Sequence, residues 1–403
     1  MRKELELYVH IPFCVRKCAY CDFLSAPASV ETMRMYADSL LEEIRRFPDC
    51  YRAGEGSNMD RGEGEDSYSE TYEVSTVFFG GGTPSIFPPE WLTEILDALR
   101  KKFRYWSGNT EITIECNPGT VDENKFRAYR GAGINRLSLG LQSANQEELE
   151  LLGRIHTWEE FLETYHAARR AGFENINVDL MSALPGQSAE SWEKTLKQVL
   201  ALNPEHISAY SLIIEEGTPF YEKYHTAAEL RDCGMDCPEL PSEEEERLMY
   251  ELTETYLKQA GMHRYEISNY AKPGFECRHN CGYWKRTDYL GFGLGAASLL
   301  ADTRYRNTDS LSSYIKMEFT GREAEKLSVE DQMEEFMFLG LRMTEGVSEK
   351  RFHEIFGDEI DAIYGDTLNK WQREGLLQRE NGNIFLTARG INYANLVMAE
   401  FLL

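Results

Sequence analysis

The sequence predicts an α/β protein, an incomplete parallel (β/α)6 barrel followed by a small α+β domain. Three observations predict this fold. Six apolar segments with strand character are each followed by a segment of helical periodicity. Each of these strands ends in a polar or glycine-rich motif. The alternation stops near Leu327, where helical patterns and one hairpin follow. Repeated βα units form parallel sheets with right-handed crossovers, and an open doubly wound sheet is the alternative.

The elements of the first part follow in chain order. A helix is predicted from Ser29 or Glu31 to about Phe47, because apolar residues recur there at helical spacing. Residues 48–70 are polar, glycine-rich and without periodicity, which predicts a flexible surface insertion; a functional lid is the alternative. The predicted strands are 5–11, 76–79, 111–115, 136–141, 175–180 and 206–214.

The second part is predicted to be winged-helix-like. A hairpin turning at Asn381-Gly382 joins residues 377–379 to 384–387. From residue 327 onward there are 14 acidic and 7 basic residues, which does not suit a phosphate backbone. We expect a barrel domain over 1–310 and a C-terminal domain over 325–403. Its predicted helices are 330–343, 349–356, 360–374 and one that begins at Arg389.

Composition and charge argue against several classes of protein. The chain has 403 residues and a formal net charge of −25, which argues against nucleic-acid binding. Nine cysteines in a chain of this length do not indicate a disulfide framework. They indicate reduced thiols that bind metal in a cytoplasmic protein. The N-terminal MRKELELYVH lacks the pattern of a signal peptide. The most apolar run, Tyr289–Ala301, is too short for a membrane span.

A cysteine loop follows the first predicted strand. Cys14, Cys18 and Cys21 have the spacing CxxxCxxC. A four-iron cluster usually takes four thiolates, so three leave one iron open to a substrate or cofactor. A zinc loop with a remote ligand and three unrelated core cysteines are the alternatives.

Polar and glycine motifs at the other strand ends are expected at the same rim, because the carboxyl ends of barrel strands carry the chemistry. Gly80-Gly81-Gly82 lets bare backbone approach a ligand, unless it is only a tight turn. A carboxylate inside an apolar strand is costly unless it is paired. Each polar side chain, taken alone, fits a structural salt bridge; together they indicate a binding site. The polar candidates are Glu115, Gln142, Arg154 and Asp179.

Two later motifs carry further candidates. His279 lies in an HNxxYW motif, and imidazole is a common heme ligand; the alternative is a packed turn with a hydrogen-bonded histidine. The pairs Cys233/Cys237 and Cys277/Cys281 have CxxxC spacing. They either hold a second metal ion or are buried or free thiols.

The cysteine loop resembles the signature of the radical S-adenosylmethionine (SAM) superfamily. The run Tyr8 to Cys14 (YVHIPFC) resembles its oxygen-independent coproporphyrinogen III oxidase branch, which includes the HemW-type heme chaperones. The resemblance implies a radical SAM partial barrel whose open side the C-terminal domain covers. It implies a 4Fe-4S cluster on the three cysteines, whose open iron chelates SAM. The implied SAM contacts are Tyr8, Tyr20, Gly81, Gly82, Thr83, Glu115, Gln142, Arg154, Asp179 and Ile213.

Within this branch the sequence favours a heme chaperone over the coproporphyrinogen dehydrogenase, which decarboxylates two propionates. The dehydrogenase has CxC at the third cluster cysteine, where this chain has Phe23, and it has an extension before its first strand. HNxxYW resembles the motif of the heme chaperones, and this resemblance implies that His279 binds heme. We expect SAM cleavage but assign no catalytic residue.

The expected partners follow from this choice. They are heme, heme-accepting proteins such as respiratory enzymes, and a reductant for the cluster. Peripheral membrane contact is expected only through an acceptor, and the expected location is the cytoplasm. A structural protein with a relic cluster is the alternative from another class.

Overall fold

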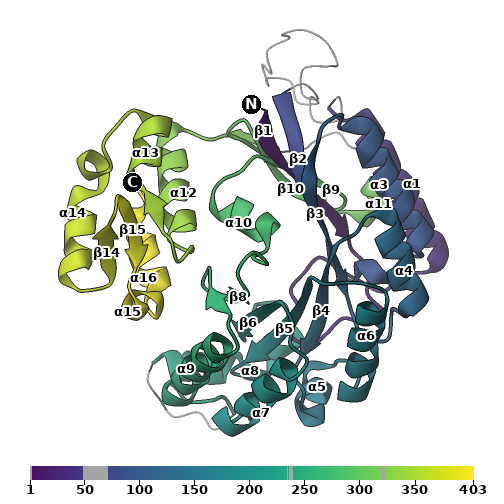
Figure 1. Cartoon of the computed structure of the whole chain (residues 1–403), viewed down its shortest axis with the longest axis horizontal. Helices are drawn as coiled ribbons and strands as arrows, with labels where there is room; N and C mark the ends of the chain where they lie inside the picture. The colour runs from purple at the N-terminus through teal and green to yellow at the C-terminus, as the bar shows by residue number, and fades with distance from the viewer. Residues whose placement is uncertain (1, 49–70, 234, 236–238, 319–322) are drawn as a thin grey trace.

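The computed structural model describes residues 2–48, 71–233, 235, 239–318 and 323–403 (Figure 1). The predicted insertion 48–70 therefore lies outside the described residues, apart from Pro48. Cys237 of the second cysteine set lies outside them as well. Among the described helices, none is long and apolar enough to cross a bilayer.

Six neighbouring parallel strands form the centre of the molecule, which confirms the predicted partial barrel. Each strand pairs in parallel with the next along the chain. Most of their side chains are buried, as in parallel sheets covered on both faces. The strands are β1 (Lys3–Ile11), β2 (Tyr72–Gly81), β3 (Trp106–Cys116), β4 (Arg136–Gln142), β5 (Ile176–Ser182) and β6 (His206–Ser211).

The prediction that the sixth strand extends to residue 214 is wrong. β6 ends at Ser211, which lies opposite Ser182, the last residue of β5. Beyond Ser211 only the Leu212 N–H still reaches β5, where it donates to the carbonyl of Ser182. Ile213 therefore lies outside the sheet and is 69% exposed.

The described part of the sheet has more strands than the sequence predicted. Its order is β12-β11-β10-β9-β1-β2-β3-β4-β5-β6-β8-β7. The apolar run Tyr289–Ala301 supplies two of the added strands and packs into the core. The added strands are β7 (His263–Arg264), β8 (Asn269–Ala271), β9 (Tyr289–Phe292), β10 (Ala297–Leu300), β11 (Thr303–Arg306) and β12 (Glu323–Lys326).

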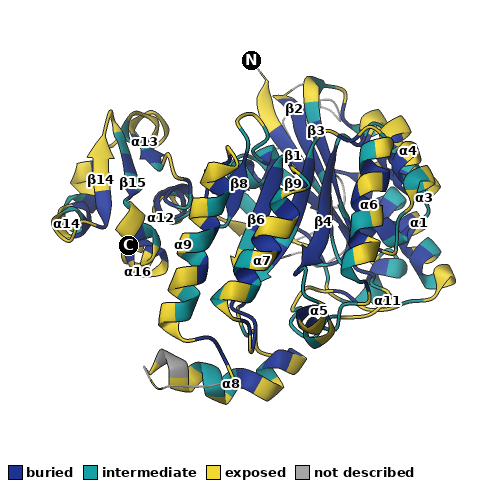
Figure 2. Ribbon diagram, turned by 60° about the horizontal axis from the view of Figure 1, so that its bottom comes forward, coloured by how far each residue is buried: buried dark blue, intermediate teal, exposed yellow. Residues whose placement is uncertain are grey.

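Helices cover the outer face of the curved sheet (Figure 1). Their buried faces pack on the strands to form one large core, and their opposite faces are exposed (Figure 2). The predicted first helix is α1 (Val30–Arg46), and the Ser29 hydroxyl accepts a hydrogen bond from the Thr32 N–H at its start. The others are α3 (Pro89–Lys102), α4 (Glu123–Ala132), α5 (Gln146–Leu152), α6 (Trp158–Arg170), α7 (Ala189–Leu200), α8 (Pro219–Asp232), α9 (Glu243–Gln259) and α11 (Leu311–Ile315).

One short helix lies on the inner side of the sheet instead. This helix, α10 (Arg278–Trp284), carries the HNxxYW motif and lies between the strands and the C-terminal part (Figure 1). It contacts β2 on one side and α12 (Val329–Gly340) on the other. The carboxylate of Glu111 accepts hydrogen bonds from the N–H groups of Arg278 and His279 at the start of α10.

The C-terminal part has a hydrophobic core of its own. Its hairpin turns at Asn381 and Gly382, whose φ angles of 53° and 79° fit the two central positions of a type I′ turn. We propose that this part is a separate domain. Besides α12, its elements are β13 (Val347–Ser348), α13 (Glu349–Phe356), α14 (Ile360–Arg373), β14 (Leu377–Glu380), β15 (Asn383–Leu386), α15 (Ala388–Ile391) and α16 (Ala394–Met398).

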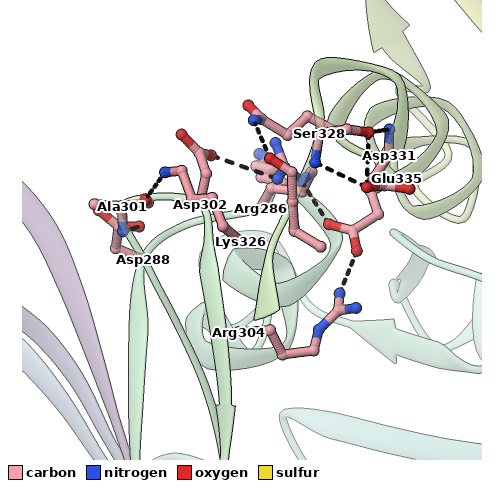
Figure 3. Close-up of polar contacts among 12 residues, drawn as sticks. Arg286, Asp288, Ala301, Asp302, Arg304, Lys326, Ser328, Asp331 and Glu335 are labelled. Carbon is pink, nitrogen blue, oxygen red and sulfur yellow. Dashed lines mark hydrogen bonds and ion pairs between the residues drawn. The ribbon is translucent and has the colours of Figure 1, made fainter. Parts of the chain in front are cut away.

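Buried ion pairs join the two parts (Figure 3). Glu335 on α12 accepts from Nε of Arg286 at 2.9 Å and pairs with Arg304 on β11. The side chains of Glu335 and Arg286 are only 7% and 8% exposed. Removing one partner of a buried ion pair leaves an uncompensated charge, so these contacts fix how α12 lies against the sheet.

Candidate functional site

The cysteine loop follows β1 and is held by backbone hydrogen bonds from distant segments. The Cys14 N–H donates to the carbonyl of Ala26 at 3.2 Å. The Ala19 N–H donates to Leu152 at the end of α5, and the Ala19 carbonyl accepts from Phe220 at the start of α8, both at 3.0 Å. These bonds place the loop at the carboxyl end of the strands, where the sequence predicts the site.

The three cysteines are free, partly exposed thiols that influence one another. Burial raises the pKa of Cys21, and negative charge on Cys18 and Cys14 raises it further. Thr83 Oγ1 donates to Cys14 Sγ at 3.6 Å. Nη1 of Arg154 donates to Cys18 Sγ at 3.7 Å. The three sulfur atoms therefore lie close enough to interact, and two of them accept from a side chain of another segment, Thr83 after β2 and Arg154 after α5.

The chemistry of this donor set fits an iron–sulfur cluster. Among the described residues, no three His, Cys, Asp or Glu side chains are placed to hold a single metal ion. An iron–sulfur cubane is bound by cysteine thiolates, each at its own iron, so three thiols of one loop need not meet at one point. The superfamily cluster would be held here by Cys14, Cys18 and Cys21.

The second cysteine set is not assembled in the part of the chain that the structure describes. Cys233 is exposed just after α8. Cys277 is buried, and its Sγ lies 3.7 Å from Oε1 of Glu111. Burial raises the pKa of Cys277, so its thiol is protonated at neutral pH. A second metal site stays an untested prediction.

The glycine motif at the end of β2 packs directly against the cysteine loop. A Cβ atom on Gly82 would lie 2.6 Å from the carbonyl oxygen of Phe13. On Gly81, which has φ +109°, it would lie 2.4 Å from Cε1 of His10. The N–H of Thr83 donates to Phe13 O at 2.7 Å. Only residues without a side chain fit at positions 81 and 82. This agrees with the expectation that Gly81 and Gly82 let another segment or a ligand lie directly against their backbone.

A polar cavity of about 190 Å³ lies on the inner side of the strands. It contains four of the predicted site residues, Tyr8, Glu115, Asp179 and His279. Asp179 accepts from Oγ of Ser138 at 3.0 Å and from Nδ2 of Asn177 at 2.8 Å. Burial raises the pKa values of both Asp179 and Glu115, and that of Glu115 reaches about 8. A cationic ligand would favour the carboxylate form of both groups.

A smaller hollow beside the cysteine loop contains Cys18, Thr83 and Arg154. Nη2 of Arg154 donates to Oδ1 of Asn117 at 2.6 Å, and the same Asn117 donates through Nδ2 to Thr83 Oγ1 at 2.8 Å. Nε of Arg154 is buried without an acceptor among the described residues. A planar guanidinium with a free N–H can bind a carboxylate. Arg154 is therefore suited to bind the carboxylate of a ligand.

The structure brings Tyr20 and Gln142 to the same region, and Leu212 and Ile214, the neighbours of Ile213, pack in one cluster with Tyr20. Tyr20 interacts electrostatically with Arg154, Cys18 and Asp179. Gln142 is buried with φ 74°, a left-handed conformation that lets the chain turn sharply at the end of β4. Ile213 lines neither hollow, because the chain leaves the sheet after Ser211. Its SAM contact stays a prediction.

Arg136 and Asn117 are among the residues of the site that sequence reasoning missed. Arg136 is 2% exposed, lines the 190 Å³ cavity and leaves its Nε without an acceptor among the described residues. Asn117 joins Arg154 to Thr83. A charge within an apolar strand, the signal that revealed Asp179, also marks Arg136. Asn117 stands directly after β3, the kind of position that revealed the other candidates.

Glu115 gives the apo protein a specific pH dependence. Because burial raises its pKa from 4.5 to about 8, its contribution to stability is full below pH 4.5 and is lost as the pH rises through 8. Glu115→Gln should remove this loss, so the variant should gain on the order of 4 kcal/mol over wild type at pH 9 relative to pH 5. Urea unfolding at both pH values measures this. An unchanged difference would show that Glu115 is ionised in the folded protein.

His279 lies deepest in the site, 1% exposed and on the inner side of the sheet. Its Nδ1 lies 2.7 Å from Thr76 Oγ1, whereas its buried Nε2 has no partner among the described residues. The ring stacks on Phe78 and meets Tyr283 edge-on, with ring centroids 5.1 and 4.9 Å apart. Burial, together with Arg136, lowers its pKa to about 3, so the imidazole is neutral at pH 7.

A parallel partial barrel with this cysteine loop and strand-end polar site defines a radical SAM protein. The radical SAM superfamily model matches residues 8–199, and the HemN C-terminal domain model matches residues 327–393. The structure is similar to that of HemN, the coproporphyrinogen III oxidase of Escherichia coli, with a TM-score of 0.78 and 24% identity over 100% of this chain and 90% of that one. This likeness shows the shared fold.

Sequence identity to known proteins shows which family within the superfamily the chain belongs to. The chain is 35% identical to the heme chaperone HemW of Bacillus subtilis over 98% of both chains. It is 33% identical to that of Lactococcus lactis over 100% of this chain and 98% of the relative. It is 30% identical to a zebrafish mitochondrial protein named for its radical SAM domain, over 92% of this chain and 80% of that one. The chain belongs to the HemW family of radical SAM proteins.

Proposed function

We propose that this protein is a heme chaperone, which binds heme and transfers it to acceptor proteins such as respiratory enzymes. The observation that carries the proposal is the unpartnered Nε2 of His279 in a cavity walled by aromatic rings. A neutral imidazole is a common ligand of heme iron. The family membership supports the same function, since the relatives from Bacillus and Lactococcus are named heme chaperones.

The surroundings of His279 favour its role as a ligand. In this proposal the Nδ1–H donates to Thr76 Oγ1 at 2.7 Å, which leaves the lone pair of Nε2 free. Glu6 Oε2 lies 3.9 Å from Nδ1 and supports a proton there. Metal-binding histidines commonly donate their other ring nitrogen to an oxygen acceptor, which fixes both tautomer and orientation.

Heme binding at His279 requires a movement of α10. The cavity holds about 190 Å³, less than the roughly 300 Å³ of the smaller ligand pockets. The helix that carries His279 forms one wall of the cavity through Asn280 and Tyr283. Displacement of α10 from β2 would open the wall and carry the imidazole with it, which suits a protein that must also release its heme.

The remaining predicted residues are proposed to hold the superfamily cofactors. Cys14, Cys18 and Cys21 would bind the 4Fe-4S cluster, which when bound supplies an electron for reductive cleavage of SAM. Arg154 would orient the SAM carboxylate beside Cys18, and the Gly81–Thr83 backbone would contact its amino group. Glu115 and Asp179 would accept from its ribose or ammonium groups. A reductant for the cluster is a further expected partner.

A hemin titration tests the proposal. We expect the cluster-reconstituted protein to give a defined Soret difference spectrum, and His279→Ala to lose the histidine-ligated form and bind hemin at least tenfold more weakly. The matched control is His263→Ala, because His263 is an exposed histidine paired with Glu276. An unchanged spectrum in His279→Ala would remove this residue as the ligand. Conversion of coproporphyrinogen III without heme binding would support the dehydrogenase instead.

A further inference from the structure

A second cavity, here called the junction cavity, lies where α10 meets the C-terminal part. It holds about 200 Å³. Its apolar lining comes from Trp284 at the end of α10, Phe336 on α12, and Met343 and Val347 beyond that helix. Gly340 and Gly346 add bare backbone to the lining. The cavity is therefore walled by flat and aliphatic side chains from both parts of the chain.

Two buried N–H donors of this lining have no hydrogen-bond acceptor among the described residues. One is Nε1 of the Trp284 indole and the other is Nη2 of Arg286. The Arg286 side chain is 8% exposed, and its Nη2 forms a long ion pair of 3.6 Å with Asp302 (Figure 3). Buried donors without acceptors are destabilising, so the cavity favours a ligand that supplies acceptor atoms.

The charge of the lining points to an anionic acceptor. Lys285, Arg286 and Arg351 line the cavity together with a single acid, Glu345. Glu345 pairs with Lys285 at 2.7 Å. Arg351 lies at the opening, and its guanidinium donates only weakly to the Lys285 carbonyl at 3.5 Å. An apolar body with a carboxylate at its edge matches both the walls and the donors.

We propose that the junction cavity binds a propionate-bearing edge of a tetrapyrrole, with the carboxylate on Arg351 and the Trp284 N–H. This inference rests on the proposed heme function, because it takes heme as the source of the carboxylate. A flat macrocycle has the aromatic and aliphatic surface that Phe336 and Met343 would cover. With 200 Å³ available, only one edge enters, and the rest of the macrocycle stays outside.

The junction cavity is distinct from the site at His279. Trp284 follows His279 by five positions on α10, which places the two side chains about 140° apart around the helix axis. His279 lines the inner cavity and Trp284 the junction cavity. The junction cavity is a docking position next to the helix that must move for heme to reach His279.

Mesoporphyrin IX, which has both propionates but no iron, tests this inference separately from iron ligation. Its affinity for the full-length protein is measured by porphyrin fluorescence anisotropy, beside that of its dimethyl ester. Arg351→Ala should weaken mesoporphyrin binding roughly tenfold, the value of one charge-assisted hydrogen bond. Trp284→Phe, which keeps the ring plane but loses the N–H, should weaken it about threefold to tenfold. Neither change should affect the ester.

Controls separate the possible failures. Lys350→Ala removes the same charge from the neighbouring position on α13, where the side chain is 85% exposed, and should leave the affinity unchanged. His279→Ala should not change mesoporphyrin binding, because that probe has no iron. Equal affinity of wild type and Arg351→Ala, or an equal loss with the ester, would overturn the junction site. The hemin spectrum of His279→Ala decides the proposed function independently.

Discussion

Replacing Cys18 with serine is expected to remove the iron–sulfur cluster almost completely. After anaerobic reconstitution, wild type should hold about four iron and four sulfide ions per chain, and the variant less than about one. Cys18 sits in the middle of the loop, and Arg154 reaches its sulfur at 3.7 Å. Serine cannot supply the soft thiolate that binds cluster iron. Iron and sulfide assays with the absorbance spectrum measure the result.

A matched cysteine substitution serves as the control for this experiment. Cys233 is free and exposed beyond α8, far along the chain from the loop. Cys233→Ser should therefore keep the wild-type iron content and spectrum. Full iron content in Cys18→Ser would show that the cluster has other ligands, and equal loss in both variants would point to a general effect of removing thiols.

The largest expected loss of stability comes from Glu43, a fully buried carboxylate on α1. It accepts from the Gly293 N–H at 2.9 Å, from Nδ2 of Asn307 at 2.7 Å and from the Tyr314 hydroxyl at 2.6 Å. Glu43→Ala leaves these three buried donors without the carboxylate. The free energy of unfolding should fall by about 3–5 kcal/mol, since each unsatisfied donor costs about 1–3 kcal/mol. Urea unfolding measures the change.

Glu42, the preceding residue, provides the control. It forms surface ion pairs with Arg45 and Arg46 on the same helix, which contribute about 0.5 kcal/mol each at most. Glu42→Ala should therefore change the free energy of unfolding by less than about 1 kcal/mol. If Glu43→Ala were equally mild, the hydrogen bonds around Glu43 would not stabilise the packing of α1 on the sheet.

The Glu43 cluster also bears on the cysteine loop. The Tyr36 hydroxyl donates to the His10 carbonyl at 2.7 Å, and the Tyr36 ring stacks on Tyr314, which donates to Glu43. His10 precedes Cys14 by four residues. The buried hydrogen bonds of α1 thus hold the end of β1 in place.

Much of the fold could be predicted because its signals are local. Six apolar segments with helical patterns between them define the parallel strands, and Asn381-Gly382 defines the hairpin. The strands β9 to β12 were missed because each is only four residues long. Their position depends on pairing with β1 and with each other, which no local pattern encodes.

The site could be predicted to a similar extent, and for a similar reason. Glu115 and Asp179 stand at or near strand ends, so the topology brings them to one rim. Arg154 follows α5 and reaches this rim by donating to Asn117 and Gly140. The strand that was predicted to carry Ile213 ends at Ser211, so its SAM contact stays a prediction. The position of His279 on the inner side of the sheet depends on how α10 packs, and the junction cavity depends on contacts between residues far apart in sequence. Neither follows from spacing.

The electron paramagnetic resonance spectrum of the reduced cluster, recorded before and after addition of SAM, tests the central claim most directly. Three cysteine ligands leave one iron open, so SAM should bind that iron and change the spectrum of the wild-type protein. Arg154→Ala should weaken the effect, since Arg154 is proposed to orient the SAM carboxylate. A four-iron cluster whose spectrum does not respond to saturating SAM would contradict the account.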